Sequence, residues 1–209
     1  LQRLEYRGYD SAGVAMINKT GDLNVYKRKG KVSELISFVK DQDTTGNIGI
    51  GHTRWATHGK PCELNAHPHV SNDEIALVHN GIIENYDLLK TALLKEGHVF
   101  HSDTDTEVLV NLIQAVQDRD QLPLEEAVRL ALTRVVGAYA IVVMDKNDPT
   151  TLVAAKKGSP MVIGIGKDDY FIASDASPIV EYTKNVVYLE DEQVAVLRKG
   201  QELKIRNLK

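Results

Sequence analysis

Short apolar segments are the feature of this sequence that most limits the folds it can adopt. They fall into two sets along the chain, residues 13–18, 23–28, 48–51 and 74–79, and then 138–144, 151–155, 161–164, 170–173, 186–189 and 193–197. Several are apolar throughout, a pattern typical of strands that are covered on both faces. Residues 19–22, Lys-Thr-Gly-Asp, predict a hairpin-like turn between the first two. We therefore expect sheets that are packed on both sides.

Helical patterns interrupt the strands mainly between the two sets. The predicted helices cover residues 86–96, 107–117 and 124–136, with a weaker candidate at 32–40. Asn85 is a candidate N-cap for the first, Thr104 and Glu107 form a capping box before the second, and Gly137 follows the end of the third. Strands outnumber helices. This order favours an α+β domain with sheet packed on sheet and helices outside.

Length, charge and cysteine use narrow the class of protein. The 209 residues suit one domain, 1–209, and a net charge of −4 gives no basic surface for nucleic acid. No apolar run reaches membrane-spanning length, so we expect no membrane partner. One cysteine, Cys62, cannot form an internal disulfide, which favours a reducing cytoplasm. The first residues, from Leu1 onward, resemble the end of a helix, and we expect the domain to lack its beginning.

Two polar clusters follow or precede the early strands. The first, Arg-Gly-Tyr-Asp-Ser-Ala-Gly at 7–13, describes a tight loop that feeds a strand, and a plain turn is its simpler interpretation. The second, at 51–59, places Arg54 at the end of a strand, beside Trp55. Arginine can hold a carboxylate with two parallel hydrogen bonds, and a neighbouring tryptophan could act as a lid. The alternative is a surface arginine beside a core tryptophan.

Two further clusters carry donors and carboxylates. Asn80 and Gly81 follow an apolar strand and offer a side-chain amide and a backbone N–H, the pair that an oxyanion hole requires. Asn-Gly is also the commonest dipeptide of tight turns. At 102–107, Asp103 and Asp105 stand at a helix start, where carboxylates usually act as caps. Two aspartates are one more than capping requires, so one of them could hold an ammonium group.

A metal site and a serine or cysteine nucleophile are the competing interpretations. Five histidines lie within 28 residues, and His67-Pro68-His69 is similar to one arm of a zinc site. The additional ligands that zinc sites use at recurring spacings are missing from the sequence, so we predict neither metal nor cofactor. Cys62 has no nucleophile signature around it. The residues themselves thus predict binding groups and donors, without a convincing nucleophile.

The clusters together resemble a known family. RGYDSAG, GHTRWATHG, NAHPH, HNGIIEN and SDTDTEV, in this order, are similar to the glutaminase domain of glucosamine-6-phosphate synthases, and the similarity covers the whole chain. These domains are class II glutamine amidotransferases within the N-terminal nucleophile hydrolases. The resemblance implies a four-layer αββα sandwich. It also implies glutamine hydrolysis through a cysteinyl thioester that supplies ammonia for converting fructose-6-phosphate into glucosamine-6-phosphate.

The resemblance also implies roles for particular residues. Asn80 and Gly81 match the oxyanion hole, Arg54 the group that binds the glutamine α-carboxylate, and Asp105 the partner of the α-ammonium. Thr57 and His58 match further contacts to the amino-acid end, and Trp55 lies on the closing loop. Arg7 and Gly8 match residues that organise the surroundings of the nucleophile. The nucleophile itself would be a Cys about twenty residues before Leu1, so we expect the 209-residue chain alone to be inactive, with a slot beside Arg7, Asn80 and Gly81.

Other functions remain open at this point. The chain could belong to another class II amidotransferase, such as a phosphoribosylpyrophosphate-dependent or asparagine-forming one, or it could be a catalytically dead glutamine- or glutamate-binding fragment. The resemblance implies glutamine as substrate, a sugar isomerase domain in the same polypeptide, and a homodimer when full-length.

Overall fold

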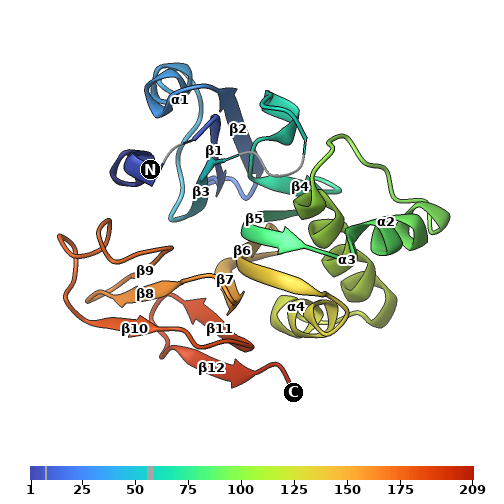
Figure 1. The fold of residues 1–209 in the computed structure, drawn as a ribbon. Coiled ribbons are helices and arrows are strands. Elements are labelled where there is room, and N and C mark those ends of the chain that lie inside the picture. The colour runs from blue at the N-terminus through green and yellow to red at the C-terminus, as the bar shows by residue number, and fades with distance from the viewer. Residues whose placement is uncertain (8, 56–58) are drawn as a thin grey trace.

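The computed structural model describes residues 1–7, 9–55 and 59–209, except the side chain of Arg7. The chain forms four layers, helix, sheet, sheet and helix (Figure 1). The α+β class and the αββα sandwich predicted above are both confirmed.

Two three-stranded sheets form one of the inner layers. The first has the order β2-β1-β3, with β1 Ser11–Ile17, β2 Leu23–Lys29 and β3 Ile48–Arg54. The second has the order β10-β8-β9, with β8 Val162–Ile165, β9 Tyr170–Ala173 and β10 Val186–Tyr188. The turn predicted between the first two strands is present, since Ile17 pairs with Leu23 in antiparallel register.

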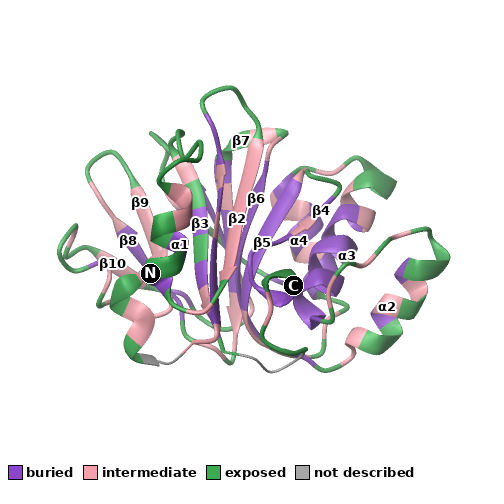
Figure 2. Cartoon of the chain, turned by 90° about the horizontal axis from the view of Figure 1, so that it is seen from above, coloured by how far each residue is buried: buried purple, intermediate pink, exposed green. Residues whose placement is uncertain are grey.

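The other inner layer is a six-stranded antiparallel sheet of order β12-β11-β7-β6-β5-β4. Its strands are β4 His69–Ser71, β5 Ile75–Ile83, β6 Gly137–Asp145, β7 Asp148–Lys157, β11 Gln193–Arg198 and β12 Lys204–Asn207. Its central strands are largely buried on both faces (Figure 2). This burial explains why their sequences read as continuous apolar runs.

Helices form the two outer layers. On one side lie α2 Tyr86–Lys95, α3 Asp105–Asp120 and α4 Leu124–Leu132, which cover the six-stranded sheet (Figure 1). On the other side, α1 Val32–Val39 packs on the β2-β1-β3 sheet through Val32 and Leu35. Two short 3₁₀ helices, η1 Gln2–Arg7 and η2 Glu63–Asn65, complete the elements.

Alternation along the strands sends side chains into two separate cores. On β5, Ile75 and Leu77 pack against the helices, whereas Ala76 and Val78 pack between the sheets. On β3, Ile50 belongs to the core between the sheets. Because successive side chains of a strand point to opposite faces, His52, Arg54 and Asn80 continue the faces that look into the space between the sheets.

Several predicted boundaries and caps were wrong in detail. The helix predicted at 124–136 ends at Leu132, and Gly137 begins β6. Asn85 does not cap α2: its amide instead bridges to Arg134 O and Val136 N, joining the helix start to the chain before β6. The capping box is half formed, since Thr104 accepts from Glu107 N while the Glu107 carboxylate accepts from His101 N and Ser102 N.

Candidate active site

A cavity of about 780 Å³ lies between the two inner layers. Apolar residues of β1, β3, β5, β6 and β9 line it, together with Arg54, Asn80, Gly81 and Asp105. The structure therefore brings together residues from three of the four polar clusters. Asn80 and Gly81 line this cavity, whereas the side chain of Arg7 lies outside the described part of the structure, so the slot beside all three residues stays a prediction.

Arg54 is the last residue of β3 and is only 3% exposed. Its guanidinium donates to the carbonyl oxygens of Gly59 at 3.1 Å and Lys60 at 3.3 Å, and its NH1 lies 3.7 Å from Oδ1 of Asp10. A buried cation that is held by carbonyl groups and one nearby carboxylate is preorganised to bind an anionic group. The alternative of a surface arginine is thus wrong.

Asn80 and Gly81 lie inside β5 and pair with Ala140 and Tyr139 of β6, so the tight-turn interpretation is wrong. Gly81 has a φ of +124°, and a Cβ at this position would collide with the carbonyl oxygen of Ala138. Only glycine fits both restraints without strain. Both Asn80 and Gly81 line the cavity.

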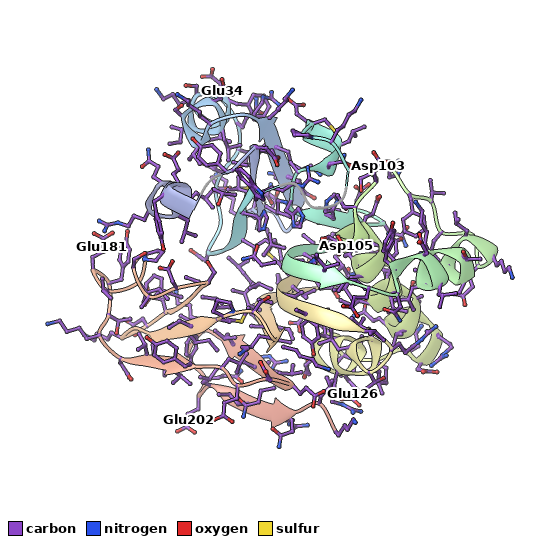
Figure 3. The ribbon with its side chains drawn as sticks, in the orientation of Figure 1. Glu34, Asp103, Asp105, Glu126, Glu181 and Glu202 are labelled. Atoms are coloured by element: carbon purple, nitrogen blue, oxygen red, sulfur yellow. The ribbon has the colours of Figure 1, made fainter. Side chains whose placement is uncertain are left out.

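Asp105, the first residue of α3, is the aspartate that enters the site. It is buried, whereas Asp103 is exposed, and Figure 3 shows Asp105 in the interior beside β5 with Asp103 farther out. Its Oδ2 accepts a hydrogen bond of 2.8 Å from the backbone N–H of Ile83, at the end of β5. One carboxylate thereby lines the cavity and also joins the start of α3 to the end of β5.

Four buried histidines, His52, His67, His69 and His79, form a cluster next to Asn80. His52 of β3 stacks on His67 with ring centroids 4.1 Å apart, and His67 meets His69 edge-on at 4.9 Å. His79 of β5 reaches Thr106 of α3, with 2.9 Å between Nδ1 and Oγ1. On the site side, Nε2 of His52 lies 2.7 Å from Oδ1 of Asn80. The cluster joins β3, β4, β5 and α3, and three of its members, His52, His67 and His79, line the cavity.

Burial keeps three of these rings, those of His52, His67 and His69, uncharged near neutral pH. Loss of solvation lowers the pKa of His52 to about 4. Burial, followed by the neighbouring His52, lowers the pKa of His67 well below its ordinary value. Burial, followed by the charge of Lys27, does the same to the pKa of His69. Neutral imidazoles have one N–H and one lone pair each, so they direct hydrogen bonds rather than supply charge.

Of the remaining predicted site residues, only Trp55 is fully described by the structure. Trp55 is 68% exposed and lines the cavity next to Arg54, and its action as a lid stays a prediction. Thr57, His58 and Gly8 lie outside the described residues, as does the side chain of Arg7.

Sequence reasoning missed several residues that shape this site. Asp10 was seen only as part of a turn, and His52 and His67 were considered only as metal ligands. The signal that could have identified His52 is its spacing: it lies two residues before Arg54 on one strand, and therefore on the same face. Position 13 also requires glycine, since a Cβ there would collide with the carbonyl oxygen of His67.

Cys62 takes no part in this arrangement. Cys62 is half-buried at the start of η2 and is not among the residues that line the cavity. Within the described ranges, no group of three or more His, Cys, Asp or Glu side chains could hold a metal ion. In the same ranges, none of the helices is both long and apolar enough to cross a membrane.

Comparisons with known proteins find clear relatives. A family model described as a glutamine amidotransferase domain matches residues 52–181. A glutamine–fructose-6-phosphate aminotransferase (isomerizing) of Bacteroides thetaiotaomicron is 60% identical over 209 residues, which are 100% of this chain and 34% of that protein. One from Chlorobaculum tepidum is 54% identical over 202 residues, 94% of this chain and 33% of that protein. The chain spans about a third of the length of these curated relatives.

Solved structures show the same likeness. A glutamine phosphoribosylpyrophosphate amidotransferase from B. subtilis has a TM-score of 0.81 and 27% identity, covering 100% of this chain and 45% of that one. A structure described as the allosteric regulatory enzyme of purine biosynthesis has a TM-score of 0.82 and 28% identity, covering 99% of this chain and 44% of that one.

Proposed function

Since this chain belongs to the glutamine amidotransferase domain family, we propose that it hydrolyses glutamine to glutamate and ammonia within a larger glutamine–fructose-6-phosphate aminotransferase. Its four-layer fold is that of the N-terminal nucleophile hydrolases.

The observation that carries the proposal is that Arg54, Asp105 and Asn80 all line one cavity. A cation and a carboxylate held on separate elements suit the two charged groups of an α-amino acid. An amide and a neighbouring glycine N–H suit the oxygen of its side-chain carbonyl as negative charge develops there. Free glutamine presents these three features together.

The proposed reaction needs a thiolate. Sulfur attacks the side-chain amide carbon, the carbonyl electrons move onto oxygen, and Asn80 and Gly81 stabilise this oxyanion. The intermediate collapses with protonation and loss of ammonia, leaving a γ-glutamyl thioester. Water then adds to the thioester, and the thiol leaves as glutamate is released. The resemblance assigns the thiol, and the α-amino group that serves as base, to a Cys about twenty residues before Leu1.

Two free strand edges support a place for such a segment. Among the described residues, β3 pairs only with β1, and β9 pairs only with β8. Gly49 and Gly51 of β3 and Ala173 of β9 line the same cavity. A strand that entered between β3 and β9 could pair with both edges, since open edges present unpaired N–H and C=O groups. We propose that the nucleophile arrives on this strand, beside Asn80.

The proposed use of the ammonia, its transfer to fructose-6-phosphate, is supported by the relatives. Relatives at 54–60% identity are named glutamine–fructose-6-phosphate aminotransferases, which favours this use of the ammonia over the phosphoribosylpyrophosphate-dependent one. We further propose a sugar isomerase domain in the same polypeptide, a homodimer when full-length and a cytoplasmic location. The length of the relatives beyond this chain supports the first of these.

The decisive experiment measures glutamate and ammonia released from glutamine by the full-length protein, with and without fructose-6-phosphate. We expect release of both products, formation of glucosamine-6-phosphate when the sugar is present, and no release from residues 1–209 alone. Consumption of phosphoribosylpyrophosphate in place of the sugar would transfer the proposal to the other amidotransferases. Binding of glutamate by calorimetry with no ammonia from the full-length protein would identify a glutamine-binding module instead.

A further inference from the structure

The neighbour of Asn80 across the two sheets is His52. The side-chain oxygen of Asn80 lies 2.7 Å from Nε2 of His52. A carbonyl oxygen can only accept, so this contact places the imidazole hydrogen on Nε2. The two residues come from β3 and β5, which belong to different sheets, so that the contact depends on how the sheets are packed.

This contact decides which atom of the Asn80 amide is available to a substrate. The amide oxygen is directed to His52, and the amide nitrogen makes no hydrogen bond with any described residue. Asn80 is half-buried and lines the cavity, so the nitrogen has room to reach a group placed there. An amide that turned by 180° would present its oxygen to the oxyanion, which would be repulsive.

The ring of His52 is itself held in place. It stacks on His67 with an interplanar angle of 13°. His67 accepts at Nδ1 from the backbone N–H of His79 at 3.3 Å, and its Nε2 lies 3.5 Å from the hydroxyl of Thr106. The support therefore extends from the first turn of α3, through two histidines, to the amide on β5. The stacking and these hydrogen bonds restrict the orientation of the His52 ring.

We infer that His52 is the positioning residue of the oxyanion hole: it donates from Nε2 to Oδ1 of Asn80 and so keeps the amide hydrogens of Asn80 directed to the reacting oxygen. This inference rests on the proposed glutaminase activity. His52 acts through Asn80 and does not touch the substrate. Its loss should therefore weaken stabilisation of the oxyanion while leaving the binding of the amino-acid end intact.

The test uses a matched pair of variants in the full-length enzyme, His52→Gln and His52→Met. The two side chains are similar in size, but only glutamine keeps a donor near the position of Nε2. We expect His52→Met to lower kcat by about tenfold to a hundredfold, less than loss of Asn80 itself, with KM for glutamine changed by less than about twofold. His52→Gln should stay within about fivefold of the wild type.

Two further measurements separate positioning from a general structural role. Glutamate γ-semialdehyde adds to the thiol and forms an oxyanion, whereas glutamate does not, so His52→Met should weaken inhibition by the aldehyde and leave inhibition by glutamate unchanged. In an Asn80→Ala background, His52→Met should lower kcat by less than about twofold further, because the group that it positions is gone.

The chain supplies a control. His98 also contacts an asparagine oxygen, Oδ1 of Asn111 at 2.9 Å, but it does not line the site cavity. His98→Met should leave kcat and the aldehyde-to-glutamate inhibition ratio unchanged. If His52→Met does not fold, His52→Asn, whose shorter amide stops short of Asn80, takes its place.

Different results would contradict the glutaminase activity and the positioning role of His52. A wild-type enzyme that releases no ammonia would overturn the glutaminase function, and this inference with it. An active wild type in which His52→Met keeps its kcat, or in which the effects of His52→Met and Asn80→Ala simply add, would overturn the inference alone. Equal weakening of aldehyde and glutamate would do the same, because it would place His52 in substrate binding.

Discussion

Asp10 and Arg54 are joined twice, by a backbone hydrogen bond of 2.6 Å from Asp10 N to Arg54 O and by a side-chain distance of 3.7 Å between Oδ1 and NH1. The loop before β1 and the end of β3 are thus held together at the point where the guanidinium enters the cavity. The position of the Arg54 guanidinium therefore depends on both residues. The carboxylate compensates part of the charge of Arg54 while its hydrogen bonds to Gly59 and Lys60 set its orientation.

Arg54 is predicted to be the main anchor for the glutamine α-carboxylate. In the full-length enzyme, Arg54→Ala should raise KM for glutamine at least about 30-fold, because truncating one partner of a buried charge pair costs about 2–5 kcal/mol. Arg54→Lys should be only a partial rescue, since an ammonium lacks the planar fork. Steady-state kinetics would show this. A KM within about twofold of the wild type, together with a lowered melting temperature, would assign Arg54 to loop structure instead.

Asn80 is predicted to act on the transition state. Asn80→Ala should lower kcat by about 10²–10³ and change KM little, because a donor to the oxyanion gains most of its strength as charge develops. Single-turnover release of ammonia is the appropriate measurement. A normal kcat combined with a raised KM would mean that Asn80 binds the substrate without stabilising the reaction.

Asp105 is predicted to have a substrate role and a structural role that can be separated. Asp105→Asn removes the charge that would attract the α-ammonium but keeps an oxygen for the backbone N–H of Ile83. It should raise KM with little loss of stability. Asp105→Ala should raise KM and also lower the free energy of unfolding by about 1–3 kcal/mol, the cost of an unsatisfied buried donor. Urea unfolding of both variants distinguishes the roles. Equal stability of the two would contradict the structural one.

The buried histidines predict a loss of stability in mild acid. Burial lowers the pKa of His52 to about 4, and it lowers the pKa values of His67 and His69 well below the ordinary value. The unfolded chain, with histidine pKa values near about 6.5, therefore binds more protons between these limits. The free energy of unfolding should fall as pH drops below about 6.5, by up to about 1.4 kcal/mol per pH unit for each histidine.

Urea unfolding at pH 7.5, 6 and 5 measures this slope. His69→Gln, which keeps a polar group near Thr104, should reduce the slope by about one histidine's share. Most carboxylates titrate below this window and contribute little to it. A free energy of unfolding that stayed constant from pH 7.5 to 5 would mean that these rings are protonated or solvated in the folded protein.

The sequence by itself determined the fold class, because that class depends on local patterns. Continuous apolar runs indicate strands that are covered on both faces, and the order of strands and helices predicted sheet packed on sheet. Arg54 at a strand end and Asn80 beside Gly81 were candidates from the chemistry of their side chains, and the family resemblance supplied their predicted roles. Caps and helix ends were less certain: Asn85 has the residue type of an N-cap, but its amide is used by the carbonyl of Arg134 and the N–H of Val136 instead.

Only the tertiary structure decided which elements that are distant in sequence come into contact. A period of two places His52, Arg54 and Ile50 on one face of β3, but it cannot tell which strand of the other sheet they will meet. The packing of β3 over β5 supplies that partner and joins His52 to Asn80. The same holds for Asp103 and Asp105: both suit a helix start, and only the position of α3 beside β5 buries the second and leaves the first exposed. Such contacts depend on how whole sheets and helices pack, and no single segment of the chain contains that information.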